Sequence, residues 1–254
     1  EMIEDREDLG NAIALNSTML NAARLIGPSI AGILVATVGE GICFLLNAVS
    51  YIPVLLSLAA LRVKPAVLAV RQRHILAELR EGLGYACRFL PIKWILILLS
   101  MISLMGVPYQ VLMPVYAKDI LNGDSHTFGF LMGGAGAGAL IGAVYLASRD
   151  TVLRLGRLIP AATALLSAGL IALSLSSSFL ISMFLIFFTG LGMMTHTAAS
   201  NTILQTISDD DKRGRVMSFY TMALMGTAPF GSLLAGWMAK VLGTPWTMFI
   251  GGAV

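Results

Sequence analysis

Long apolar segments dominate this chain and restrict it to a membrane fold. A helix needs about 20 mostly apolar residues to cross the hydrocarbon core of a bilayer. Seven segments reach roughly that length and an eighth begins near the last residue. In chain order they cover Asn11–Thr37, Gly41–Leu61, Ile92–Tyr116, Thr127–Ala147, Leu158–Leu175, Phe179–Ala199, Val216–Val241 and Pro245 onward. The sequence therefore predicts an all-α membrane protein.

Composition supports the same class. Hydrophobic residues make up 57% of the chain and charged residues 12%, whereas soluble domains carry about 25% charged residues. The net charge of +3 does not indicate nucleic acid binding, because the charges follow a topological pattern. Cys43 and Cys87 do not have the spacing of metal ligands, and we expect no cofactor or metal.

The connections between the apolar segments alternate in charge. Of the 17 Lys and Arg residues, 14 lie in residues 1–10, 62–93, 148–157 and 209–215, all on one side of the predicted topology. The positive-inside rule places that side in the cytoplasm. Lys118 and Lys240 fall on the opposite side, and Arg24 lies within a span.

The long basic connection, residues 62–91, is predicted to be a cytoplasmic linker. From Ile75 on, apolar residues recur at helical spacing, with Arg80 and Arg88 between them. This pattern favours a helix in the membrane interface, with its arginines against anionic headgroups. The alternative is a solvated linker helix.

An internal repeat relates the two ends of the chain. A shift of 204 residues aligns Gly10, Gly27, Ala31, Gly32 and Gly39 with identical residues, and both copies enter the membrane from the cytoplasmic side. A parallel repeat of this kind is typical of transporters with two six-helix halves. Because the chain begins with Glu1 and ends in an apolar stretch, we expect it to be a fragment that lacks about four spans.

Several stretches resemble the major facilitator superfamily, and more narrowly its bacterial branch of enterobactin-exporter-like permeases and transmembrane secretion effectors. They are residues 6–17, Phe44–Ala48, Leu79–Gly82, Met113–Pro114 and Arg213–Ser218. The resemblance implies a two-bundle transporter in the bacterial plasma (inner) membrane. Residues 1–61 would be spans five and six of the N-terminal bundle. Residues 62–91 would be the linker, and residues 92–254 the C-terminal bundle from span seven to the start of span twelve.

The resemblance also assigns a motif to the first predicted span. Gly27, Pro28 and Gly32 are similar to the Gly-Pro motif on the fifth span of exporters in this superfamily. The match departs at Ala31, where a second glycine is common. The superfamily's cytoplasmic Asp-Arg-Gly-Arg signature has only a degenerate counterpart here, at residues 148–157.

Arg24 is the sharpest candidate for substrate binding. A charge at this depth costs at least about 2.5 kcal/mol, so it should face a cavity or an ionic partner. Ser17, Asn21 and Arg24 lie three or four residues apart and share a helix face. The two interpretations are a cavity cation that binds an anionic group of the substrate, and a structural ion pair with an acid elsewhere in the membrane.

The other candidate residues are weaker. No Asp or Glu lies inside a predicted span, so His196 is the titratable candidate for proton coupling, against the alternative of an ordinary hydrogen-bonded histidine. Tyr109 and Gln110 follow Pro108, and a proline kink often marks a cavity or gate. Tyr220 is a similar candidate in a later span. Packing alone is the alternative for each.

These observations favour a secondary transporter that exports a small amphipathic molecule, siderophore-like or drug-like, by alternating access and coupled to protons. A membrane-embedded enzyme is disfavoured, because the three histidines are scattered and no acid lies within a span. The alternative is a non-transporting sensor or assembly protein that retains the transporter fold, since a fold does not fix a function.

Overall fold

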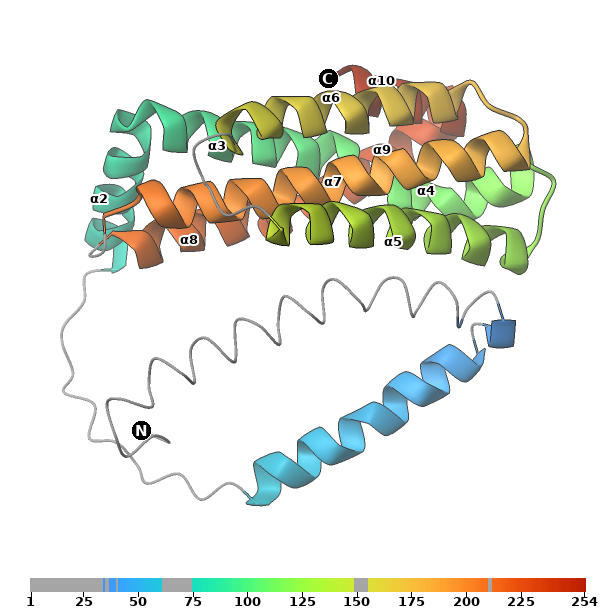
Figure 1. The fold of residues 1–254 in the computed structure, drawn as a ribbon, viewed down its shortest axis with the longest axis horizontal. Helices are drawn as coiled ribbons and strands as arrows, with labels where there is room; N and C mark the ends of the chain where they lie inside the picture. Colours follow the sequence, from blue (N-terminus) through green and yellow to red (C-terminus); the bar gives the residue numbers. More distant parts are fainter. Residues whose placement is uncertain (1–33, 35–36, 40, 61–74, 149–154, 210–211) are drawn as a thin grey trace.

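The computed structural model describes residues 34, 37–39, 41–60, 75–148, 155–209 and 212–254, and all regular structure among them is helical. Six of these helices are long and apolar enough to cross a membrane. They are Gly41–Ala60, Leu90–Ile120, Ser125–Leu146, Leu155–Ser174, Phe179–Ile207 and Arg213–Leu242. The predicted all-α membrane fold is confirmed (Figure 1). The first predicted span, Asn11–Thr37, lies almost entirely outside the described residues.

Two of the six spans are composed of several elements. The first of them contains α3 (Leu90–Met101), the π-helical turn η1 (Ile102–Gly106), α4 (Tyr109–Val115) and a second π-helical turn, η2 (Tyr116–Ile120). The other contains α8 (Arg213–Thr221), the π-helical turn η4 (Met222–Gly226) and α9 (Ala228–Leu242). The remaining elements are α2 (Ile75–Arg88), α5 (Ser125–Ala147), α6 (Leu155–Ser174), α7 (Phe179–Ile207) and α10 (Thr244–Ala253).

Local sequence explains several helix boundaries. Asp124 caps α5 by accepting a hydrogen bond from the Thr127 backbone N–H (3.0 Å), and the Thr127 hydroxyl oxygen accepts one from the Asp124 backbone N–H (3.3 Å). This reciprocal capping box satisfies two amides that lack partners within the helix. The chain turns from α9 into α10 at Gly243, whose φ of 89° suits glycine. By contrast, α7 continues eight residues beyond its predicted end, because a polar sequence does not by itself end a helix.

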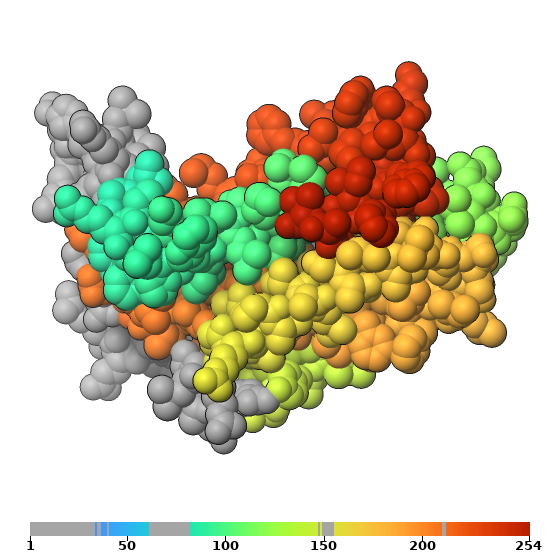
Figure 2. Space-filling model, turned by 90° about the horizontal axis from the view of Figure 1, so that it is seen from above, coloured from blue at the N-terminus to red at the C-terminus, as the bar shows by residue number. Residues whose placement is uncertain are grey.

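The described bundle is arranged around α7. Figure 1 shows α7 running between α6 and α5, and its most extensive contacts are with these two helices. Helix α10 packs against α6, and it also contacts α9 and η1. Seen from above, α10 lies beside α6 on this face of the bundle (Figure 2).

Glycines permit the close approach of α5 and α7. A methyl group at Gly138 would overlap the backbone carbonyl of Phe187, and one at Gly190 would overlap that of Ala135. Gly134, Gly138 and Gly142 form a small-xxx-small ridge on α5, which predicts such packing from the sequence, and the structure confirms it. The two backbones therefore meet directly, without side chains between them.

The outer surface of the bundle is apolar, as a bilayer requires. Leu180 is 78% exposed and Leu233 is 73% exposed, and they are two of many large apolar side chains that together cover this surface. The helix Gly41–Ala60 has no buried residue, and Figure 1 shows it apart from the bundle. The predicted division at residues 62–91 stays a prediction, because residues 61–74 lie outside the described residues.

The close contact between α5 and α7 makes a stability prediction. We expect Gly138→Ala in the full-length protein to cost about 1–3 kcal/mol, because overpacking forces the backbones apart. Gly236→Ala is the matched control, since among the described residues no atom beyond its own helical turn and chain neighbours lies within 4 Å of the position that its methyl group would take. Thermal unfolding in detergent should show a lower melting temperature for Gly138→Ala alone. Equal melting temperatures would contradict the proposed contact.

Candidate functional site

Two neighbouring spans are interrupted at the same place in the bundle. The π-helical turn η1 interrupts one span, η4 interrupts the other, and the two turns contact each other. A π-helical turn inserts one extra residue into a helix and often lies at a functional site. The Ser103 hydroxyl, on η1, donates a hydrogen bond to the backbone carbonyl of Leu224, on η4 (2.6 Å). This bond joins the two interruptions directly.

Small residues bring the same two spans together just beyond η4. A methyl group at Gly231, on α9, would overlap the backbone carbonyl of Leu104, on η1. Prolines follow both interruptions, Pro108 after η1 and Pro229 after η4. Each proline lacks a backbone N–H and leaves a carbonyl of the preceding turn without its helical partner. In both spans the regular helical hydrogen bonding is therefore interrupted at the same level of the bundle.

A buried polar pair links α6 to α7. The His196 ring is fully buried, and its Nδ1 lies 3.0 Å from the Thr163 hydroxyl. Because that hydroxyl donates its hydrogen to the Ile159 carbonyl (2.9 Å), we assign the ring proton to Nδ1, which donates to Thr163. The neutral ring then has its acceptor on Nε2. That atom is buried and has no hydrogen-bond partner among the described residues.

Tyr220 holds α8 against α7 next to this histidine. Its hydroxyl donates a hydrogen bond to the Thr197 carbonyl (3.2 Å), and the side chain is buried. Val216 and Leu204 belong to the same buried apolar cluster. The structure thus places Tyr220 of α8 against Thr197, the residue next to His196 on α7.

Tyr109 and Gln110 lie at the start of α4, beyond the η1 interruption. The Tyr109 side chain is buried in the main apolar cluster with Leu112 and Met113, whereas Gln110 is exposed on the surface of the bundle. Adjacent residues on a helix point in different directions, so only one of the two reaches this surface. The exposed amide of Gln110 is the one available to a ligand.

A family model of transmembrane secretion effectors, within the major facilitator superfamily, matches residues 1–254. The chain belongs to this family. The resemblance predicted from the sequence is therefore confirmed, and the chain is a multi-pass membrane protein of a transporter family.

Curated relatives of this transmembrane secretion effector carry two kinds of name. The "Staphyloferrin A transporter" of Staphylococcus aureus is 25% identical over 252 residues, which are 98% of this chain and 62% of the relative. The "Multidrug efflux pump Tap" of Mycobacterium tuberculosis is 26% identical over 233 residues, 89% of this chain and 54% of the relative. The chain thus spans between about half and three fifths of the length of these relatives.

Six predicted site residues fall outside the described residues. They are the three of the Arg24 face and the three of the Gly-Pro motif: Ser17, Asn21, Arg24, Gly27, Pro28 and Gly32. The four that are described form no single cluster, since Tyr109 and Gln110 lie on α4 and His196 and Tyr220 lie around α7. Their roles stay predictions.

Sequence reasoning missed three polar residues that join helices. These are Ser103 between η1 and η4, Thr163 beside His196, and Tyr116 at the far end of its span. In the sequence, each of them could have been noticed as a polar side chain within an apolar span, because a polar group there needs a hydrogen-bond partner. The identity of the partner lay beyond the sequence, because all three bonds join residues far apart in the chain.

Tyr116 makes the most connected of these contacts. Its buried hydroxyl lies 2.9 Å from the Leu173 carbonyl, 2.8 Å from the Ser176 carbonyl and 2.9 Å from the Ser182 hydroxyl. It therefore fixes η2 against the turn between α6 and α7. The Leu173 carbonyl also accepts from the Ser176 backbone N–H (3.1 Å), and the Ser182 hydroxyl donates to the Ser176 hydroxyl (3.0 Å). Removal of the Tyr116 hydroxyl therefore leaves the partly buried Ser176 carbonyl without a partner among the described residues.

We expect Tyr116→Phe to destabilise the full-length protein by about 1–3 kcal/mol, the range for a buried group left unsatisfied. Tyr51→Phe is the matched control, because Tyr51 is 58% exposed. Thermal unfolding of the purified proteins in detergent measures both. A Tyr116→Phe protein as stable as the control would contradict the role of this hydroxyl.

Proposed function

We propose that this protein is a secondary active transporter that exports a small amphipathic molecule, siderophore-like or drug-like, by alternating access and coupled to protons. Membership of the transmembrane secretion effector family supports transport, and the similarity to a staphyloferrin A transporter and a multidrug efflux pump supports this substrate class. The observation that carries the mechanism is the pair of π-helical turns, η1 and η4, that interrupts two adjacent spans at one level.

Paired interruptions supply the flexibility that alternating access needs. In a continuous helix, the two halves of a span move together, because each backbone hydrogen bond ties one turn to the next. At η1 and η4 these backbone hydrogen bonds are irregular, and a proline follows each of the two turns. The two halves of each span can then tilt relative to each other, and the Ser103–Leu224 bond makes both spans bend at the same point.

The substrate path would include the exposed amide of Gln110 on α4 and the guanidinium of Arg24. An intramembrane arginine is well suited to bind an anionic group such as a carboxylate or a catecholate, because its planar fork donates several hydrogen bonds. Gln110 adds a neutral donor and acceptor. Together they favour an amphipathic ligand with an anionic end.

His196 is the proposed site of proton coupling within this chain. The sequence holds no acid inside a predicted span, and histidine is the side chain whose charge changes nearest neutral pH. Its Nε2 atom is the acceptor in the assigned tautomer and has no hydrogen-bond partner among the described residues. Protonation there would place a charge between α6 and α7 and alter how they pack, which is a direct way to link proton binding to helix movement.

The test is export by the full-length protein in cells that lack their main efflux pumps, with a panel of siderophores and dyes. We expect export to stop when a protonophore is added. Arg24→Ala should lower export of anionic compounds by about tenfold or more, because a hydrogen bond to a charged group contributes about 1.5–3 kcal/mol. Neutral and cationic compounds should be spared, and Arg24→Lys should retain part of the activity.

Three outcomes would count against the proposal. Export that persists after the protonophore would contradict proton coupling. An equal loss for anionic and cationic compounds in Arg24→Ala would contradict the role of Arg24 as a ligand and favour the structural ion pair. A folded protein that binds compounds but exports none would favour the sensor or assembly protein.

A further inference from the structure

The helix α2 packs one face against the bundle. Its two buried positions, Gly82 and Ala86, lie four residues apart and therefore share a side of the helix. Gly82 faces α8, because a methyl group there would lie 3.0 Å from the Phe219 ring and 3.4 Å from the Cβ atom of Arg215. Ala86 is 3% exposed. Small residues thus let α2 approach α8 closely.

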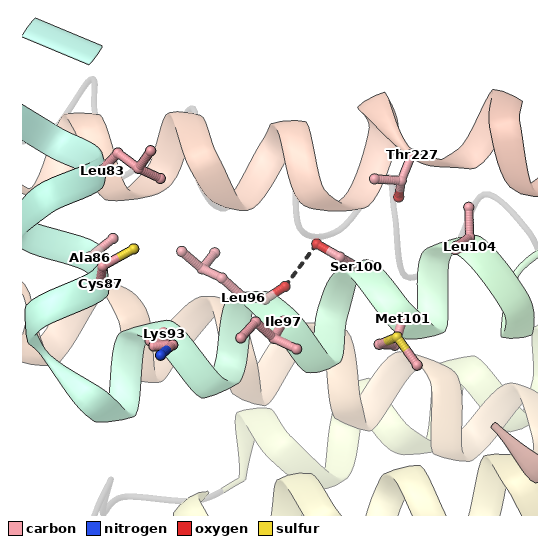
Figure 3. Close-up of a pocket in the computed structure, with 10 residues that line it drawn as sticks. All are labelled: Leu83, Ala86, Cys87, Lys93, Leu96, Ile97, Ser100, Met101, Leu104 and Thr227. Carbon is pink, nitrogen blue, oxygen red and sulfur yellow. Dashed lines mark hydrogen bonds between the residues drawn. The ribbon is translucent and has the colours of Figure 1, made fainter. Parts of the chain in front are cut away.

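The same face of α2 also contacts α3. Ala86 belongs to a buried apolar cluster that includes Ile92 and Leu99 of α3 and Val216 and Tyr220 of α8. Figure 3 shows this corner of the bundle, where α2 meets the beginning of α3 and Ala86 lies on the side of α2 that faces it. The cluster therefore joins α2 to both of the spans that contain a π-helical interruption.

A hydrogen bond connects α2 to the turn between α7 and α8. The Tyr85 hydroxyl accepts it from the backbone N–H of Asp209 (3.2 Å). Beside this turn, the Arg213 Nε–H donates to the Gln205 carbonyl near the end of α7 (2.9 Å). The beginning of α8 is thus held from two directions, by α7 and by α2.

These contacts join α3 and α8 at the ends that lie away from the interruptions. At the other ends, where α3 continues into η1 and α8 into η4, the bond from Ser103 to the Leu224 carbonyl joins the same two spans. The helices α3 and α8 are therefore connected twice, once through α2 and once through the paired turns. Two helices that are connected at both ends resist tilting away from each other.

We propose that α2 is a clamp that makes α3 and α8 tilt as one unit, so that the spans interrupted at η1 and η4 bend in the same direction. The tilting rests on the alternating access of the proposed function, whereas the clamp itself can be tested without transport. The contacts of Gly82, Tyr85 and Ala86 carry the proposal. A linker helix held by lipid headgroups or by water alone would not need a buried face against two spans.

Cross-linking tests whether α2 and α8 stay together. Gly82→Cys with Arg215→Cys brings two Cβ atoms close to the separation of about 3.5–4.5 Å that a disulfide requires. The full-length protein, with every other cysteine replaced by serine, would receive a brief pulse of oxidant in sealed vesicles, with and without an imposed pH difference. We expect the same cross-linking rate in both conditions. Export by the oxidised protein should equal export by the reduced protein, because the clamp does not open.

The matched control pairs Gly84→Cys with Arg215→Cys. Among the described residues, no atom beyond its own helical turn and chain neighbours lies within 4 Å of the methyl position at Gly84. This pair should therefore cross-link at least about tenfold more slowly than the pair at Gly82, because its sulfur atoms are out of register.

A second variant loosens the clamp. Ala86→Phe overfills the buried corner between α2, α3 and α8. We expect amide hydrogen exchange to rise by about fivefold or more in α3 and α8 together, while α5 keeps its protection. Export should fall in the same variant. Cys87→Phe is the matched control, because Cys87 is the next residue on α2 and is exposed.

Three results would overturn the clamp. They are a cross-linking rate that changes with the pH difference, export that is lost on oxidation and restored by a reductant, and hydrogen exchange in Ala86→Phe that rises in only one of α3 and α8. If the cysteine-free protein exports nothing, the proposed function fails instead, and the cross-linking rates and the hydrogen exchange decide on the clamp by themselves.

Discussion

The hydrogen bond from Ser103 to the Leu224 carbonyl is the interaction on which the described bundle most depends. Within hydrocarbon, a backbone carbonyl without a partner costs several kcal/mol, so a helix can be interrupted only where the protein supplies another donor. Here the donor comes from a neighbouring span that is interrupted at the same level. The irregular turn η4 is therefore supported by a donor from η1, and Gly231 allows the two backbones to approach.

The rest of the bundle is built more rigidly. The helices α5 and α7 meet backbone to backbone through Gly138 and Gly190, and Tyr116 ties the end of its span to the turn between α6 and α7. The proposed alternating access needs both properties, because two spans can tilt only relative to helices that keep their positions. In that proposal, the spans that contain η1 and η4 are the parts that bend, and the closely packed α5, α6 and α7 are the parts that do not.

Much of this architecture could be predicted from the sequence, for a clear physical reason. A span must be apolar over its whole length, so hydropathy alone located six described segments, and the spacing of Gly134, Gly138 and Gly142 predicted close packing. The π-helical turns escaped prediction because one extra residue in a helix leaves no mark in composition. Polar pairing escaped it too, because Ser and Thr in helices often bond to their own preceding turn, as Thr189 does with Leu185. Only the structure tells which of them, like Ser103, reach across to another span.

Net movement of a compound driven by a proton gradient tests the central claim most directly. The full-length protein would be reconstituted into sealed vesicles with a fluorescent dye or a siderophore, and an imposed pH difference would supply the energy. The account predicts accumulation of the compound against its own gradient, which disappears when an ionophore removes the pH difference. Binding without accumulation, at any pH difference of either sign, would contradict it and identify the protein as a membrane receptor with a transporter's fold.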